Sequence, residues 1–528
     1  MRLAYNREEL VFLYERLVKK AEQRFEKGEY SKSIKCIESA ASFQYLFNDR
    51  YSDNRQNLIL KEISSKLYPL KNYLSNSNIV FFYESFCLDN RGLTQQYLDA
   101  LVSCNKYKIV LILECPISDS GQEILQYCNS NDIEIKPILG NSWHEKADYL
   151  FNLINEYEPK AALFHLTPSS FLPFIAFEPF KSIKKYQINL TDHAFWLGSS
   201  DFFDYSYEFR DYGAIVSLEK RGFLQNQIII NPYYPWQSNM EFQGFPISTD
   251  GKIVVFSGGH PYKIEGDNGK YYEMVAHILE HNSDVLFFYA GDGDLSFLQK
   301  FITENHYEER MFLLGNRKDI DAVFKRCDIY LNTHPFGGGL MVQYAAINGK
   351  PILVYNSPSF DDLVCTKKMA HISFDTIEDF YKEADKLIDD YNYRKQRGEY
   401  FKSLIAGQDD FRRRFISTFL NDNKPDSCPR QLSIDYDNFC MECLYKINHN
   451  VYKFFENLFL KSNIFSLKVI VNFLLYLPSY ITKMYELKKE NEEQCVNIKF
   501  HGDWKSKIIR FITNIFNPFT YVNIIKLF

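Results

Sequence analysis

The stretch that decides the fold reads Asp328-Ile-Tyr-Leu-Asn-Thr-His-Pro-Phe-Gly-Gly-Gly-Leu-Met-Val-Gln-Tyr-Ala-Ala-Ile-Asn-Gly-Lys-Pro-Ile-Leu-Val354. An apolar strand is followed by three glycines, a helix of small residues, the turn Gly349-Lys350-Pro351 and a second strand. Glycines at a helix start leave backbone amides uncovered, and the positive end of the helix dipole lies there too. The stretch therefore predicts a seat for phosphate and a phosphorylated ligand.

Length and composition indicate a globular protein of two or three domains. The chain has 528 residues, of which 46% are hydrophobic and 24% charged, and a single core rarely extends over so many residues. The net charge is -6, whereas broad nucleic-acid binding normally needs a basic face. We expect no nucleic-acid partner.

The cysteines favour a reducing compartment. The first residues lack the apolar core of a signal peptide, so the eleven cysteines are expected to be reduced in the cytoplasm. Cys428, Cys440, Cys443 and His449 could together supply four zinc ligands. A second Cys-x-x-Cys pair is missing from the sequence, which favours buried or free thiols, and we predict no metal and no cofactor.

The pattern of apolar and polar residues changes three times along the chain. Apolar residues at helical spacing run from Glu8 to about Leu67, with one clear break at Gly28. Short β-branched and aromatic runs then alternate with helical stretches in two successive series, and each series predicts a parallel sheet covered by helices on both faces. The predicted strands are Ile79–Tyr83, Lys108–Leu113, Ile133–Leu139, Ala161–His165 and Tyr186–Leu190 in the first series, and Lys252–Ser257, Val285–Ala290, Arg310–Leu314, Asp328–Leu331 and Pro351–Tyr355 in the second. Two prolines near Asn231 mark the join between the series. The predicted parts are a helical N-terminal extension (1–75), a Rossmann-like acceptor-side domain (76–240), a Rossmann-like donor domain (241–425) and a helical C-terminal region (426–528).

The C-terminal region is apolar and basic. Its most apolar run, Phe465 to Ile481, is interrupted by Lys468, Asn472 and Pro478, so it does not predict a spanning helix of about 20 apolar residues. Peripheral contact with a membrane, docking on a partner and an ordinary helical core all remain open.

Polar and glycine-rich loops follow four strands of the second series. They begin at Ser257, Gly291, Gly315 and His334. Because the carboxyl ends of parallel strands meet at one edge of a sheet, these loops should converge on one ligand.

The quoted motifs resemble those of the GT-B glycosyltransferases that use nucleotide-sugar donors, especially family 4, with a looser likeness to the O-GlcNAc-transferase-like branch. The resemblance covers roughly Ile79 to Gln408 and rests on four motifs. They are Ala290-Gly-Asp-Gly293, Gly315-Asn-Arg317, Asp328-Ile-Tyr-Leu-Asn-Thr-His-Pro335 and the glycine-rich helix ending Gly349-Lys-Pro351. It implies an α/β fold in which two Rossmann-like domains face a cleft, with a nucleoside-diphosphate sugar, UDP first among the nucleotides, in the second domain.

By this resemblance the loop at Asn316 and Arg317 frames the base, and the amides of Gly338, Gly339 and Leu340 take the diphosphate. Lys263 or Arg317 would offset the negative charge of the leaving diphosphate. The predicted donor-binding residues are Gly258, Gly259, Lys263, Gly291, Asn316, Arg317, His334, Gly337, Gly338, Gly339, Leu340 and Gln343.

The chain departs from family 4 at two positions. Many members have two glutamates across the glycine-rich segment, and here the matching residues are Phe336 and Tyr344, with Gln343 as the nearest polar group.

The segment Asp292-Gly-Asp294 has the same pattern as a metal-binding motif of another glycosyltransferase fold. Its place in a turn predicts instead that Asp294 caps the following helix.

In the first domain, Asp192 and His193 follow a buried strand, as a histidine does in many GT-B transferases. Histidine titrates near neutrality and could accept a proton from an acceptor hydroxyl, so the two residues are the candidate catalytic pair. The alternative is a structural histidine in a turn that Asp192 caps. The loop from Asp201 to Tyr212 could also meet an acceptor.

The sequence thus predicts a glycosyltransferase that moves a hexosyl group from a UDP-sugar to a hydroxyl of a glycan or of a lipid-linked acceptor in polysaccharide biosynthesis. A protein acceptor is the main variant. A non-catalytic partner subunit of an active transferase and, less favoured, a sugar-nucleotide epimerase are the alternatives. We expect the protein in the cytoplasm, with the inner face of the membrane as one place of action.

Overall fold

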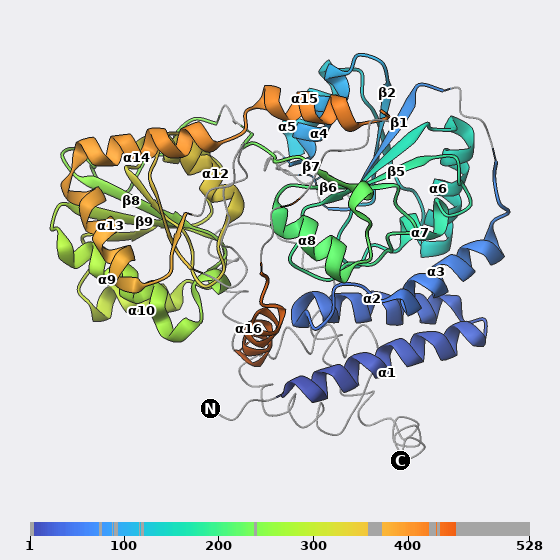
Figure 1. Cartoon of the computed structure of the whole chain (residues 1–528), viewed down its shortest axis with the longest axis horizontal. Coiled ribbons are helices and arrows are strands. Elements are labelled where there is room, and N and C mark those ends of the chain that lie inside the picture. The colour runs from blue at the N-terminus through green and yellow to red at the C-terminus, as the bar shows by residue number, and fades with distance from the viewer. Residues whose placement is uncertain are drawn as a thin grey trace.

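The computed structural model describes residues 5–72, 77–86, 88, 93–115, 117, 121–236, 240–356, 372–421, 429 and 433–449. Two sheet-containing domains lie beside each other, and the helical N-terminal extension runs along one side of the first domain (Figure 1). The predicted C-terminal run from Phe465 to Ile481 falls outside the described residues, as does most of the region 426–528.

The N-terminal extension consists of three helices: α1 (Arg7–Glu26), α2 (Tyr30–Phe47) and α3 (Asn54–Leu67). Asn6 and Glu9 form a capping box at the start of α1, and Asp53 caps α3. The sequence predicted helices up to about residue 67 with one break near Gly28. The structure has a second break at Asn48, which ends α2 in the left-handed conformation.

The first domain has a seven-stranded parallel sheet in the order β3-β2-β1-β4-β5-β6-β7. Successive residues of β1 point to opposite faces, because Val80 and Phe82 join one core cluster and Phe81 and Tyr83 the other. The elements are β1 (Ile79–Glu84), α4 (Leu93–Ser103), β2 (Lys108–Leu113), α5 (Gln122–Ser130), β3 (Glu134–Pro137), α6 (Trp143–Tyr157), β4 (Ala161–His165), α7 (Leu172–Ala176), β5 (Lys184–Asn189), β6 (Tyr205–Glu208), α8 (Asp211–Lys220) and β7 (Ile228–Ile230).

The second domain has a six-stranded parallel sheet in the order β10-β9-β8-β11-β12-β13. Helices cover both faces, with separate core clusters on the two sides of β8. The elements are β8 (Ile253–Gly258), α9 (Lys270–His281), β9 (Val285–Ala290), α10 (Ser296–Glu304), β10 (Met311–Leu313), α11 (Ile320–Arg326), β11 (Ile329–Leu331), α12 (Gly339–Ile347), β12 (Ile352–Tyr355), β13 (Ser373–Phe374), α13 (Ile377–Asp389) and α14 (Tyr391–Leu404). The prediction of two Rossmann-like α/β domains with helical extensions is confirmed.

One helix lies on a different domain from the one that its place in the sequence suggested. The predicted donor domain ran to residue 425, but α15 (Gln408–Thr418) crosses back and packs on α4 of the first domain (Figure 1). Phe411 and Phe415 join the first domain's core, and Arg412 pairs with Asp99 at 2.7 Å. Aromatic burial and this ion pair therefore hold the chain end against the first domain.

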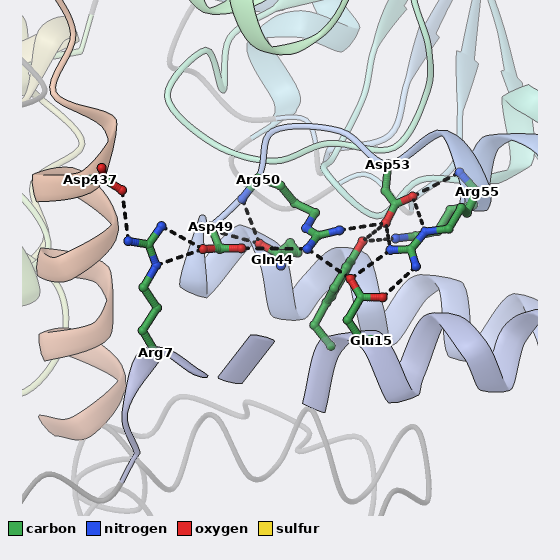
Figure 2. Close-up of polar contacts among 10 residues, drawn as sticks. Arg7, Glu15, Gln44, Asp49, Arg50, Asp53, Arg55 and Asp437 are labelled. Atoms are coloured by element: carbon green, nitrogen blue, oxygen red, sulfur yellow. Dashed lines mark hydrogen bonds and ion pairs between the residues drawn. The ribbon is translucent and has the colours of Figure 1, made fainter. Parts of the chain in front are cut away.

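Helix α16 (Tyr436–His449) connects three parts of the molecule. Figure 2 shows Arg7 of α1 between Asp49, which follows α2, and Asp437 of α16, with nitrogen to oxygen distances of 3.0 and 2.9 Å. The Asn448 side chain also accepts a hydrogen bond from the Tyr5 amide and donates one to its carbonyl. The N-terminal extension is thus the platform on which α16 is docked.

A second group of charged side chains in Figure 2 holds the helices of that platform together. Arg55 pairs with Glu15 and with Asp53, each at 2.6 Å, and Arg50 pairs with the same two carboxylates.

Among the helices that the structure describes, none is long and apolar enough to cross a membrane.

Candidate functional site

The loops after β8, β9 and β10 meet at the carboxyl edge of the second sheet, as predicted from their positions. The Gly259 amide donates to the Ala290 carbonyl at 2.9 Å, and the Gly291 amide donates to the Gly315 carbonyl at 3.0 Å. A Cβ at Gly291 would lie 2.3 Å from the Gly259 carbonyl oxygen, and one at Gly258 would lie 2.6 Å from the Ala290 oxygen. Gly258 and Gly291 are therefore required because the loop backbones touch.

The triple-glycine segment leads into α12 with Gly338 as its N-cap. The Gly338 amide donates to Asn332 Oδ1 at 3.0 Å, so this amide already has an acceptor. The amides of Gly339 and Leu340 lie in the first turn, where helix geometry supplies no acceptor. A Cβ at Gly339 would meet only the Tyr233 hydroxyl, at 3.8 Å, so packing does not require glycine there.

Lys263 is the cation nearest to this helix start. It is partly buried, and its Nζ lies 3.4 Å from the Gly337 carbonyl oxygen. The Phe336 amide donates to the Lys263 carbonyl at 3.2 Å, which ties the two loops together. Burial lowers the pKa of Lys263 to about 8, and no carboxylate of the described residues forms an ion pair with it. The segment places a desolvated cation beside uncovered helix amides, which is an arrangement suited to an anion.

The other predicted cation, Arg317, has its charge satisfied within the protein. Its guanidinium forms two hydrogen bonds with the Asp319 carboxylate, at 2.7 and 2.6 Å, and a third with the Gly244 carbonyl at 2.7 Å. The adjacent Asn316 is exposed and could reach a base. Lys263 therefore suits the diphosphate better than Arg317 does.

His334 and Gln343, two more predicted donor residues, are buried and support neighbouring loops. His334 Nε2 lies 2.7 Å from Asp267 Oδ2, and this contact lowers the pKa of Asp267. Gln343 Nε2 donates to the Tyr233 carbonyl at 3.0 Å, while its Oε1 is buried without a partner among the described residues. Gln343 thus holds the segment that joins the two domains.

The positions that match the family 4 glutamates contact other parts of the protein. The Tyr344 hydroxyl donates to the Trp236 carbonyl at 2.8 Å. Phe336 forms a small cluster with Phe439 and Cys443 of α16, and Lys446 lies over its ring. Aromatic side chains here serve contacts between domains.

Asp192 and His193 lie at the carboxyl edge of the first sheet. Arg210 contacts both oxygens of the Asp192 carboxylate, at 2.5 and 2.8 Å. Burial tends to raise the pKa of Asp192, but the charge and hydrogen bonds of Arg210 outweigh it and hold the pKa at about 2. His193 Nδ1 lies 3.5 Å from Asp192 Oδ1, a long contact that contributes to lowering the pKa of Asp192. The sequence prediction did not foresee that Arg210 binds Asp192.

Helix α16 brings further groups that the sequence analysis did not assign. Phe439 meets the His193 ring edge to face, and desolvation lowers the pKa of His193. Burial also lowers the pKa of Lys446 to about 7, and the charge of Lys263 acts in the same direction. Apolar residues at three- and four-residue spacing in α16 were the available signal. What that helix would contact could not be read from the pattern.

The expectation that the protein binds no metal ion stays a prediction. Within the described ranges, no group of three His, Cys, Asp or Glu side chains is arranged to hold a metal ion. Cys440 and Cys443 are buried in apolar clusters, whereas Cys428 and the His449 side chain lie outside the described residues. Asp294 Oδ1 accepts a hydrogen bond from the Ser296 amide at the start of α10, as expected of a residue in a capping turn.

The family model described as "Glycosyl transferases group 1" matches residues 243–404, which contain the glycine-rich segment and Lys263. No curated protein matches the sequence.

Three solved structures illustrate what the chain is similar to. A mutant O-GlcNAc transferase of Thermobaculum terrenum has 12% identity and a TM-score of 0.46, covering 83% of this chain and 85% of its own. Anabaena HepE in complex with UDP and glucose has 11% identity and a TM-score of 0.45, with coverages of 71% and 99%. A glycosyltransferase from Rickettsia africae has 12% identity and a TM-score of 0.44, with coverages of 73% and 99%.

Proposed function

We propose that this chain, whose residues 243–404 match the family model of the group 1 glycosyl transferases, is a glycosyltransferase that moves a hexosyl group from a UDP-sugar to a hydroxyl of a glycan or of a lipid-linked acceptor. We take UDP as the nucleotide because the sequence motifs resemble those of GT-B glycosyltransferases, for which a UDP-sugar is the first expectation. We place this reaction in the cytoplasm, in polysaccharide biosynthesis, with acceptors carried at the inner face of a membrane as one case.

The observation that carries the proposal is the position of Lys263. An ammonium that is desolvated without a carboxylate partner among the described residues is costly, and proteins retain such groups mainly at functional sites. Its Nζ lies beside the segment that begins α12, where the amides of Gly339 and Leu340 can donate to phosphate oxygens. A diphosphate would satisfy both the cation and the amides.

The same geometry explains how this site would assist transfer. Negative charge develops on the diphosphate as the bond to the sugar breaks, and fixed donors in a partly desolvated site stabilise that charge. The acceptor would approach from the carboxyl edge of the first sheet. Leu340 packs against the core clusters of both domains, so the start of α12 lies against the first domain.

The proposal is tested by incubating the protein with UDP-glucose, UDP-galactose, UDP-N-acetylglucosamine and the corresponding GDP-sugars, and by measuring released nucleotide. We expect UDP to raise the melting temperature and at least one UDP-sugar to release UDP slowly, even with water as the acceptor. If no sugar nucleotide is bound or cleaved, the proposal fails.

A matched pair of variants locates the nucleotide. Gly339→Ala adds a methyl group at the helix start without a steric clash, so it should fold normally but weaken UDP binding by about tenfold or more, since a displaced charge-assisted hydrogen bond contributes about 1.5–3 kcal/mol. Gly407→Ala is the control, because Gly407 is the N-cap of α15 and has open space around its Cα. Equal UDP affinities for the two variants would place the nucleotide elsewhere.

A further inference from the structure

The first sheet has a polar pair at the point where its strand order reverses. In the order β3-β2-β1-β4-β5-β6-β7, the chain moves outward in one direction before β4 and in the other direction after it. Open parallel sheets bind ligands in the crevice at such a switch point. Glu84 is the last residue of β1, His165 is the last residue of β4, and the two are direct partners in the register of the sheet. Neither residue belongs to the donor site described above.

The contacts of Glu84 fix the protonation of the His165 ring. His165 Nδ1 lies 2.7 Å from Glu84 Oε2, and the same carboxylate accepts hydrogen bonds from the Thr94 hydroxyl at 2.6 Å and the Phe86 amide at 2.8 Å. When this carboxylate only accepts hydrogen bonds, as it does from Thr94 and Phe86, Nδ1 of His165 carries the proton. In the neutral imidazole, Nε2 is then the basic nitrogen.

The imidazole is also held in place from its face. The Phe86 ring stacks on it with a centroid distance of 4.6 Å and an interplanar angle of 29°. His165 is only 6% exposed, yet Nε2 has no hydrogen-bond partner among the described residues. A ring nitrogen that can accept a proton, lies at the switch point of the sheet and has no partner among the described residues points to a ligand that donates one.

We propose that His165, positioned by Glu84, accepts the proton of the acceptor hydroxyl during sugar transfer; this inference rests on the function proposed above. The hydroxyl oxygen forms a bond to the anomeric carbon, and the bond from that carbon to the UDP oxygen breaks. UDP leaves with the electron pair of the broken bond, and the hydroxyl proton moves to His165 Nε2. The ligand at the switch point is therefore an alcohol-type acceptor.

The geometry favours His165 over His193 for this step. A general base needs a third group that holds its ring in one tautomer. At His193 that group would be Asp192, whose Oδ1 lies 3.5 Å from the ring nitrogen and whose two oxygens both bind Arg210. At His165 the corresponding distance to the Glu84 carboxylate is only 2.7 Å.

The test uses the full chain with two probe nucleophiles, water and azide, and a UDP-sugar that the wild-type protein cleaves. His165→Ala should reduce UDP release to water by about 100-fold or more, because general-base catalysis contributes about 10²- to 10⁴-fold. Azide has no proton to lose, so adding it should restore UDP release in this variant and give a glycosyl azide. Glu84→Gln keeps a hydrogen-bond acceptor without the charge and should give an intermediate rate.

His277→Ala is the matched control. His277 Nε2 lies 2.7 Å from Asp385, and its ring stacks on Tyr381, but the pair lies between α9 and α13 of the second domain. This variant should cleave the UDP-sugar at the wild-type rate. Melting curves and UDP affinity of all variants show whether they fold.

The outcomes separate the inference from the proposed function. If His165→Ala folds, binds UDP and hydrolyses the sugar nucleotide within threefold of wild type, His165 is not the base. The inference is also overturned if azide fails to restore UDP release in a variant that still binds UDP. If the wild-type protein neither binds nor cleaves any sugar nucleotide, the proposed function itself fails, whatever His165 does.

Discussion

Replacing Lys263 by methionine should stabilise the protein while weakening its binding of UDP. Methionine retains most of the aliphatic stem and removes the ammonium, so the change tests the charge. The pKa of Lys263 falls from its ordinary value of 10.5 to about 8 because the group is desolvated. At 1.36 kcal/mol per pH unit, this corresponds to a cost of at most about 3 kcal/mol to the folded state, and less where water reaches the ammonium.

The sign of this effect depends on pH in a defined way. A lysine with a lowered folded pKa destabilises the folded state fully below that pKa, and the cost is relieved as pH rises from about 8 to 10.5. The gain from Lys263→Met should therefore be largest near pH 7 and fall to about 1 kcal/mol at pH 10. UDP affinity at pH 7 should fall roughly 10- to 100-fold, as expected for the loss of about 1.5–3 kcal/mol from a charge-assisted contact.

Thermal melts over a series of UDP concentrations measure both quantities together. Lys252→Met is the matched control, because Lys252 lies just before β8, at its amino end, and pairs with Asp284 on the surface at 2.6 Å. It should change neither UDP affinity nor stability by more than about 1 kcal/mol. A Lys263→Met protein that binds UDP within twofold of wild type would refute the assignment. One that melts below wild type at pH 7 would refute the desolvation argument.

Three further predictions follow from other contacts. Asp192→Asn should lower the free energy of unfolding in urea at pH 7 by about 3–5 kcal/mol, because it removes the carboxylate that neutralises buried Arg210. In the wild type the stabilisation from this ion pair is present above pH 3.8 and is lost as pH falls toward about 2. An unchanged urea midpoint would contradict this prediction. Phe439→Ala should raise the pKa of His193 in an NMR titration by letting water reach the ring, whereas Met441→Ala on the exposed face of α16 should not; equal titration curves would show that Phe439 does not cover His193. Gly291→Ala should lower stability by about 1–3 kcal/mol because its Cβ would lie 2.3 Å from the Gly259 carbonyl oxygen, and a melting temperature equal to that of wild type would mean that these loops separate easily.

Much of the fold could be predicted from the sequence because apolar runs of parallel strands are local signals. The predicted strands of both series lie within a few residues of those in the structure, including Ile79–Glu84 and Val285–Ala290. The strands β6, β7 and β13 were missed, since Tyr205–Glu208 contains alternating polar residues, Ile228–Ile230 is only three residues long and Ser373–Phe374 only two. All three are recruited by pairing with neighbours in the sheet.

The candidate site was predictable only in part. The loop positions and the glycine-rich segment follow from the order of strands and turns. The ion pair of Arg317 with Asp319 had a sequence signal, because the residues are two positions apart. The pairing of Arg210 with Asp192 depends on how β6 and α8 return to the edge of the sheet, and no local pattern reveals it.

The sequence by itself determined the class of fold and the position of the glycine-rich segment between two strands, because these depend on short-range periodicity and backbone geometry. Only the tertiary structure decided which charges remain available. Among the described residues no carboxylate pairs with Lys263, whereas Asp319 neutralises Arg317, and Phe439 of α16 packs against the His193 ring. Glu84 and His165, 81 positions apart, become partners because parallel pairing of β1 and β4 aligns their last residues. Desolvation and ion pairing depend on neighbours from distant segments, and folding alone brings those segments together.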